Sequence, residues 1–68
     1  MKDISIQFGI NLKNRRKELK ITQEKMALLA DIDRSYMGRI ERGEVNITLL
    51  KAYHLAQVLD SNVKELLP

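Results

Sequence analysis

Two helix-sized segments in the middle of the chain follow each other with almost no chain between them. Thr22 and Asp33 stand directly before these segments, where side-chain oxygens commonly accept hydrogen bonds from the free N–H groups of a first helical turn. Gly43 follows the second segment, and glycine often ends a helix because it takes positive φ without strain. The pattern predicts helices over residues 22–30 and 33–41, joined by a turn of about three residues.

Short helices joined in this way form a helix-turn-helix, here at about residues 22–42. Such a pair can hold its second helix in the DNA major groove while its first helix contacts the backbone. The motif therefore predicts a protein that binds double-stranded DNA.

The segments on both sides of this pair also show helical spacing of apolar residues. We expect a first helix over about residues 5–19, a fourth that begins after Thr48, and a short fifth that begins after Asn62. Glu65, three residues after Asn62, would complete an approximate capping box. The residues expected to face the core are Phe8, Leu12, Leu19, Met26, Ala27, Ala30, Tyr36, Met37, Ile40, Leu49, Ala52, Leu55, Ala56, Leu59, Leu66 and Leu67.

The fold class that follows is all-α, a compact five-helix bundle that contains the helix-turn-helix. With 68 residues and no linker or repeat, the chain is expected to form a single DNA-binding domain over residues 1–68. The fourth and fifth helices, at about residues 48–67, are expected to complete the core and to support dimerisation. A core this small has modest stability, which favours an oligomer.

The basic residues are clustered rather than spread along the chain, whose formal net charge is +3. One group falls in the first expected helix and the other in and just after the third, whereas the acidic residues are scattered. Affinity for a nucleic-acid backbone comes from several cations acting on one run of phosphates, so this clustering favours DNA as the partner. The two groups are Lys13, Arg15, Arg16, Lys17 and Lys20, and then Arg34, Arg39 and Arg42.

Catalytic and metal-binding functions have no support in the sequence. The chain has no cysteine and a single histidine, His54, so we expect no metal site. Asp31 and Asp33 do not form a carboxylate pair, because residues at i and i+2 of a helix point apart. No P-loop, nucleophile elbow or glycine-rich phosphate motif is present, so we expect no enzyme and no cofactor.

Targeting signals are likewise not evident. No apolar run approaches the length of about 20 residues that spans a bilayer, and the N-terminus lacks the pattern of a signal peptide. We expect a cytoplasmic protein that has no membrane partner.

Three stretches resemble the phage-repressor/Cro (Xre) family of DNA-binding proteins: TQEKMA at 22–27, DRSYMGRIERG at 33–43 and NITL at 46–49. The similarity covers about residues 6–67, and residues 33–36 and 46–49 look closest to the controller proteins of restriction–modification systems. The resemblance implies a lambda-repressor-like fold, a homodimer and a palindromic operator. Two positions depart from the family pattern, which often has glycine near Lys20 and proline near Ile47, and Val45 stands where controller proteins often have a basic residue.

The resemblance also implies a set of DNA contacts. Arg34, Ser35 and Arg39 match positions where family members touch base edges, and arginine can bond guanine O6 and N7 together. The alternative is that these are ordinary solvated residues of a helix surface. The residues expected at the DNA backbone are Lys13, Arg16, Gln23, Tyr36, Arg42 and Asn46.

Three of the backbone assignments compete with structural roles. Arg16 and Glu41 match a family pattern in which a first-helix arginine pairs with the glutamate that ends the third helix. Tyr36 can belong to the core, and Asn46 can be only a turn former.

A dimer surface is expected on the fourth and fifth helices. Leu50 lies outside the inward set of its helix, and Tyr53, three residues on, shares its side. With Val63, Leu66 and Leu67 these residues form the expected seam, although the fifth helix can equally bury its leucines within its own chain.

The sequence as a whole predicts a sequence-specific transcriptional regulator that binds a palindromic operator as a homodimer. As a restriction–modification controller or a phage-type repressor, encoded by a bacterium or a phage, it would either occlude a promoter or contact RNA polymerase. Two alternatives remain open. One is the antitoxin of a toxin–antitoxin pair, and the other is a helical protein-interaction module that has lost DNA binding.

Overall fold

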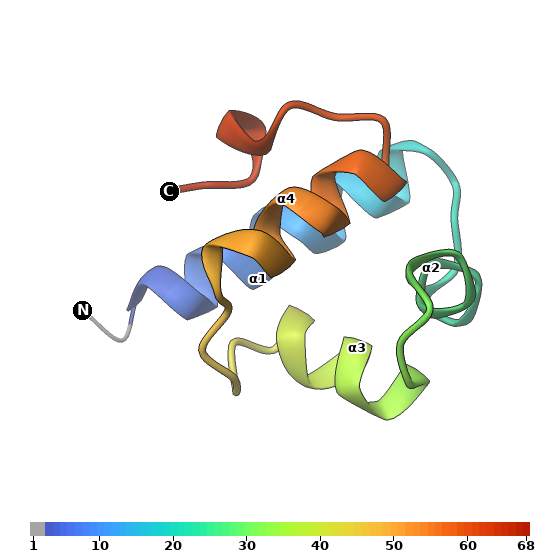
Figure 1. The fold of residues 1–68 in the computed structure, drawn as a ribbon, viewed down its shortest axis with the longest axis horizontal. Coiled ribbons are helices and arrows are strands. Elements are labelled where there is room, and N and C mark those ends of the chain that lie inside the picture. Colours follow the sequence, from blue (N-terminus) through green and yellow to red (C-terminus); the bar gives the residue numbers. More distant parts are fainter. Residues whose placement is uncertain (1–2) are drawn as a thin grey trace.

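The computed structural model describes residues 3–68, which form four α-helices and one 3₁₀ turn. The first helix is α1 (Asp3–Glu18), which leads into the short helices α2 (Gln23–Ala30) and α3 (Arg34–Glu41) (Figure 1). It ends with α4 (Leu49–Val58) and the 3₁₀ turn η1 (Val63–Glu65). The expected all-α class and the helix-turn-helix formed by α2 and α3 are confirmed.

Side-chain caps begin three of the helices at the expected residues. Thr22 Oγ1 accepts a hydrogen bond from the Lys25 N–H at 3.0 Å, and Thr48 Oγ1 accepts one from the Lys51 N–H at 3.1 Å. Asp33 Oδ2 accepts from the Ser35 N–H at 3.1 Å. Each bond satisfies a donor that has no partner within its helix, so these caps explain why α2, α3 and α4 begin where they do.

The expectation of five helices is wrong in its last element. The Asn62–Glu65 capping box forms as expected, but only the three residues Val63–Glu65 follow it as a 3₁₀ turn. The Leu66 N–H bonds to the Val63 carbonyl at 2.9 Å. Because a 3₁₀ helix has about three residues per turn, Val63 and Leu66 fall on one side and both reach the core.

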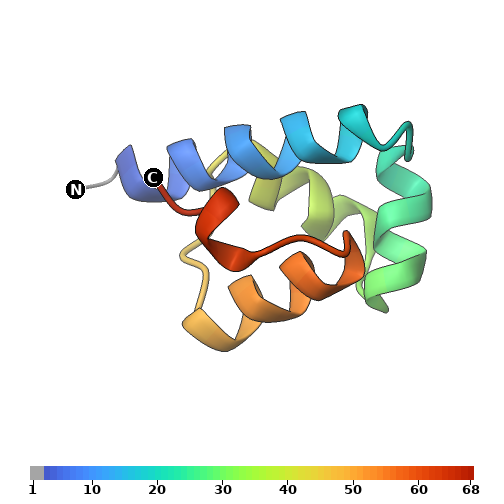
Figure 2. The same ribbon diagram turned by 90° about the horizontal axis from the view of Figure 1, so that it is seen from above.

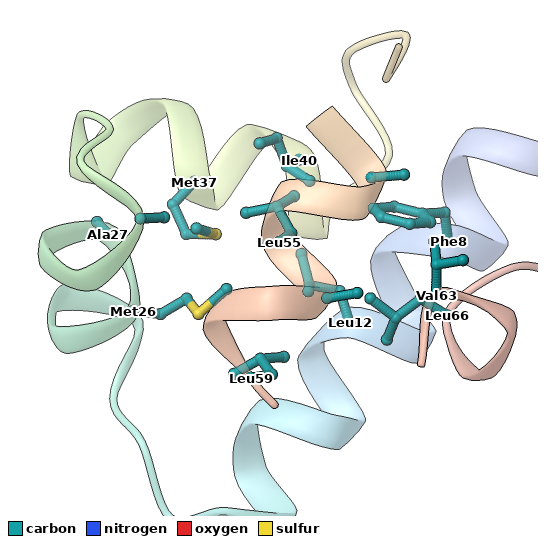
Figure 3. Close-up of a cluster of buried hydrophobic side chains, with 13 residues drawn as sticks. Phe8, Leu12, Met26, Ala27, Met37, Ile40, Leu55, Leu59, Val63 and Leu66 are labelled. Atoms are coloured by element: carbon teal, nitrogen blue, oxygen red, sulfur yellow. The ribbon is translucent and has the colours of Figure 1, made fainter. Parts of the chain in front are cut away.

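One cluster of buried apolar side chains joins all five elements (Figure 3). Most of the expected core residues belong to it, but Leu19, Leu49 and Leu67 are 38%, 65% and 40% exposed. Leu19 follows the last residue of α1, where Lys20 turns the chain with φ of 60°. Leu49 is the first residue of α4, and Leu67 follows η1, so none of the three keeps the helix register that predicted burial.

The third helix is held from two sides. It packs against α1 and α2, while α4 packs against α2 and η1. Figure 2 shows α1 and α4 along opposite sides of the molecule. In Figure 1, α2 is seen almost end-on whereas α3 lies across the view, so these two helices cross rather than run parallel.

Two glycines allow α1 to approach α3 and the loop after it. A Cβ atom at Gly9 would lie 2.5 Å from the Ile40 carbonyl oxygen and 2.6 Å from that of Glu41. A Cβ at Gly43, where φ is +74°, would lie 2.6 Å from the Ile6 Cα. The backbones meet too closely at both places for any larger residue, and this fixes α3 against α1.

We expect Gly9→Ala to destabilise the fold, because the new methyl group meets backbone atoms that cannot rotate away. Overpacking of this kind costs about 1–3 kcal/mol, and each kcal/mol lowers the Tm of so small a domain by about 4–8 °C. Thermal unfolding followed by circular dichroism measures the change.

Gly38→Ala is the matched control for this substitution. The nearest atom to a Cβ there is the flexible Arg42 Nη1 at 3.1 Å, so the helix-forming tendency of alanine should dominate. An equal fall in Tm for both variants would contradict the close-approach argument.

Candidate nucleic-acid interface

The first turn of α2 and the outer face of α3 enclose a shallow polar hollow of about 390 Å³. Arg34 and Ser35 lie at one end of α3, and Arg42 lies at the other. Gly38 forms the floor between them, because a Cβ there would come within 3.5 Å of the Gln23 side chain. The full lining is Gln23, Asp33, Arg34, Ser35, Gly38 and Arg42.

The start of α3 presents two of the residues predicted to contact bases. Arg34 is the first residue of the helix, and its side chain is exposed. Ser35 is also exposed, but its hydroxyl donates a hydrogen bond to Asp33 Oδ2. While that bond is made, the Ser35 oxygen can only accept, so it suits the amino group of adenine or cytosine.

The two hydrogen bonds from Ser35, first that of its hydroxyl and then that of its N–H, hold the pKa of Asp33 below its ordinary value. Because the folded pKa is depressed, the contribution of this cap to stability is present above the unfolded pKa of about 3.9. That contribution is lost as the pH falls through the folded value.

The end of α3 carries the remaining arginines together with an acid. Arg42 donates from Nε to Glu44 Oε2 at 2.8 Å, and Arg39 Nε lies 3.9 Å from Glu44 Oε1. The hydrogen bond from Arg42 holds the pKa of Glu44 below its ordinary value, and Glu44 raises that of Arg42. The sequence analysis did not single out Glu44, although an acid that directly follows Gly43 and the basic group Arg34, Arg39 and Arg42 is visible in the sequence.

Arg16 and Glu41 form a buried ion pair at the junction of α1 and α3. Arg16 Nε donates to Glu41 Oε2 at 2.7 Å, and Nη2 donates to Oε1 at 3.1 Å. Arg16 Nη1 donates to the Ile21 carbonyl at 2.7 Å, and only 7% of the residue is exposed. With its guanidinium enclosed in this way, Arg16 cannot reach a phosphate, so its predicted place among the backbone contacts is wrong.

Gln23 extends the same network to the first residue of α2. Its Nε2 donates to Glu41 Oε1 at 3.1 Å, and the side chain is half-buried. One N–H of the amide is used in this bond, which leaves the second N–H for an outside acceptor such as a phosphate. Every buried side-chain nitrogen or oxygen found in residues 3–68 has a hydrogen-bond partner.

The other predicted backbone contacts lie at several places around α3. Lys13 is exposed on α1, and Asn46 is exposed in the loop after α3, where its Oδ1 accepts from Ser5 Oγ at 3.5 Å. Tyr36 is half-buried and packs against the core, so the tyrosine serves the fold even if its hydroxyl reaches DNA.

Of the five residues predicted at the dimer interface, two are buried and three are exposed. Val63 and Leu66 are 9% and 0% exposed and pack in the core of their own chain, which contradicts their predicted place at an interface. The 3₁₀ spacing that turns both inward is the physical reason. Leu50, Tyr53 and Leu67 remain exposed, Leu50 most of all at 83%.

The single histidine makes a hydrogen bond that links two helices. His54 Nε2 donates to the Ala30 carbonyl at 2.9 Å and ties α4 to the end of α2. Among residues 3–68 no group of three or more His, Cys, Asp or Glu side chains is placed to hold a metal ion. Of the helices described, none has the length and apolar character required to cross a membrane.

Comparison with known proteins identifies relatives that match most of this chain. A helix-turn-helix family profile matches residues 12–66. Control protein C.MunI from Mycoplasma sp is 39% identical over 67 residues, which is 97% of this chain and 90% of that protein. The crystal structure of the restriction–modification controller protein C.AhdI from Aeromonas hydrophila superposes with a TM-score of 0.84 at 39% identity, covering 90% of this chain and 92% of that one.

The same fold also occurs inside an enzyme. Hydroxypropylphosphonic acid epoxidase from S. wedmorenis matches with a TM-score of 0.92 at 29% identity, but this chain spans only 36% of that protein. The two relatives matched along about nine tenths of their length are control proteins rather than enzymes, as expected for this chain. A similar fold does not by itself establish a function, so the function has to be argued from the residues on the surface.

We expect Glu41→Gln to lower the free energy of unfolding by about 3 kcal/mol, because it leaves the Arg16 guanidinium buried without its counter-charge. Chemical denaturation with urea measures this loss. Glu18→Gln is the control: it removes the same charge from an exposed pair with Arg15, and such pairs contribute about 0–1 kcal/mol. Similar losses in both variants would show that burial of the ion pair has no special role.

Proposed function

This chain belongs to the Xre-type helix-turn-helix family, and on that premise we propose that it is a transcriptional regulator that binds double-stranded DNA in a sequence-specific manner. The similarity to the control proteins C.MunI and C.AhdI favours the role of a restriction–modification controller. In this proposal residues 1–68 act as one DNA-binding domain, and α3 is the recognition helix.

The observation that carries the proposal is the polar hollow between α2 and α3. An α-helix with its side chains is about 10–12 Å across, which fits a major groove about 12 Å wide, and the eight residues of α3 extend roughly 12 Å along it. Arg34 and Ser35 at its exposed start, with Arg39 one turn further on, then face the base edges. Arg34 is the strongest candidate for a base reader, because its planar guanidinium can bond guanine O6 and N7 together.

Phosphate contacts would hold α3 in this position. The first N–H groups of α2 and the free N–H of Gln23 together offer donors to one phosphate, at the positive end of the helix dipole. Lys13, Arg42 and Asn46 lie exposed on neighbouring elements and supply further contacts. Affinity should therefore fall steeply as salt rises.

We also propose that the protein binds DNA as a homodimer. The exposed apolar side chains of Leu49, Leu50, Tyr53 and Leu67 lie along α4 and just beyond η1, which makes them the proposed dimer surface. One protomer measures 29 × 24 × 20 Å. Two protomers side by side can thus place their recognition helices about 34 Å apart, in successive major grooves of a palindromic operator.

A bound dimer would act in the bacterial cytoplasm, on its own or a neighbouring promoter, either by occluding the promoter or by contacting RNA polymerase. The antitoxin alternative differs by requiring a protein toxin that co-purifies with the chain. The interaction-module alternative predicts no saturable DNA binding, which the exposed arginines of α3 argue against.

Arg34→Ala should weaken binding to the operator about tenfold to a hundredfold, the range expected for one lost bidentate base contact. Fluorescence anisotropy with a duplex from the region upstream of the gene, next to a shuffled duplex, measures the effect. Binding to the shuffled duplex should change much less, because Arg34 is assigned to bases.

Lys64→Ala removes the same charge from η1, away from the proposed DNA interface, and serves as the control. Equal losses for Lys64→Ala and Arg34→Ala would contradict the assignment of α3 as the recognition helix.

Leu50→Glu should shift the protein from dimer towards monomer, because a carboxylate would be buried in the proposed interface. Sedimentation equilibrium measures the dimer dissociation constant, which should rise at least tenfold. Leu28→Glu on α2 is the matched control, since Leu28 is also highly exposed, at 72%, but lies outside the proposed surface. An unchanged dimer dissociation constant for Leu50→Glu would show that the dimer interface does not include Leu50.

A further inference from the structure

The surface that carries the arginines also holds the carboxylate of Glu44, which the proposed DNA contacts do not use. Glu44 Oε2 accepts from Arg42 Nε at 2.8 Å, and Oε1 lies 3.4 Å from Nη2 of the same arginine. Oε1 also lies 3.9 Å from Arg39 Nε. The side chains of Arg39, Glu44 and Arg42 are 54%, 49% and 60% exposed, so this group faces solvent rather than the core.

The backbone fixes Glu44 in this place. Gly43 has φ of +74°, its N–H bonds to the Ile40 carbonyl at 3.0 Å, and the Glu44 N–H bonds to the Arg39 carbonyl at 2.9 Å. These two bonds form a Schellman motif, the common way to end a helix at glycine. The residue after that glycine is thereby anchored to the end of α3, and its side chain folds back beside Arg42.

The electrostatics of this position oppose an acid. The C-terminal end of a helix carries partial negative charge, so a carboxylate there is repelled, and a DNA backbone would repel it again. Arg39 and Arg42 offset this repulsion, and the bond from Arg42 lowers the pKa of Glu44. The carboxylate is therefore ionised at neutral pH and occupies two arginines that could otherwise neutralise phosphates.

We propose that Glu44 sets the discrimination between operator and random DNA by occupying Arg39 and Arg42 in the free protein. This inference rests on the proposed function. On random DNA these arginines can only replace their contact with the Glu44 carboxylate by a contact with a phosphate. This replacement adds little binding free energy. On the operator, base-edge acceptors give Arg39 bonds that exceed its long contact with Glu44, and the exchange becomes favourable.

Glu44→Gln tests the proposal, because the amide keeps the shape of the side chain and removes its charge. Anisotropy titrations with a shuffled duplex should show binding about five- to tenfold tighter than for the parent protein, as expected for roughly one added phosphate contact near 0.1 M salt. Binding to the operator should tighten less, so the ratio of the two affinities falls. The slope of log affinity against log salt on the shuffled duplex should steepen by about one.

Two further variants separate this role from a general effect of charge. Glu18→Gln raises the net charge equally, at the exposed pair with Arg15, and should leave both affinities nearly unchanged. In an Arg42→Gln background, Glu44→Gln should give a smaller gain, because the arginine that it would free is missing. Thermal unfolding of each variant shows whether the fold is kept.

Three results would overturn the proposal: an unchanged affinity for the shuffled duplex, an equal gain with Glu18→Gln, or weaker operator binding by Glu44→Gln. The last would make Glu44 a direct base reader. Failure of the parent protein to bind any duplex would instead refute the proposed function, so the two failures are distinct.

Discussion

The buried contact between Arg16 and Glu41 is the interaction on which the arrangement of the helices depends. Its donors and acceptors join α1, the loop at Ile21, Gln23 at the start of α2, and the end of α3. Removing two charges from water is costly, and a pair without further bonds would not recover that cost. Here four hydrogen bonds satisfy the pair, so it specifies one position of α3 relative to both neighbours.

A helix of eight residues has little stability of its own, so α3 depends on such contacts for both its existence and its direction. The close approach of backbones at Gly9 and Gly43 supplies the second constraint, because it brings α1 near enough for Arg16 to reach Glu41. Apolar packing of Met37 and Ile40 adds the third. Since these residues use the inner face of α3, the outer face is left to Arg34, Ser35, Gly38 and Arg39, and this division creates the candidate DNA interface.

Much of this could be predicted from sequence, and the failures have physical causes. Local signals at Thr22, Asp33 and Thr48 located the helix starts, because a cap depends on a few neighbouring atoms. The segment after Asn62 forms a 3₁₀ turn because Val63 and Leu66 both pack into the core. The local sequence does not indicate that both side chains point inward. Similarly, charge alone could not separate Arg16, which is buried, from Lys13 and Lys17, which are exposed. The role of Glu44 depends on the chain reversal at Gly43, which the pattern predicted without showing where the next side chain would lie.

We assign DNA binding to the surface formed by the outer face of α3 and the start of α2. The most direct measurement is an NMR titration of ¹⁵N-labelled protein with a duplex from the region upstream of its gene. We expect the largest shift changes on Gln23, on residues 33–42 and on Asn46, and little change on the exposed residues of η1. Shift changes concentrated on α4 and η1, with α3 unaffected, would contradict this assignment.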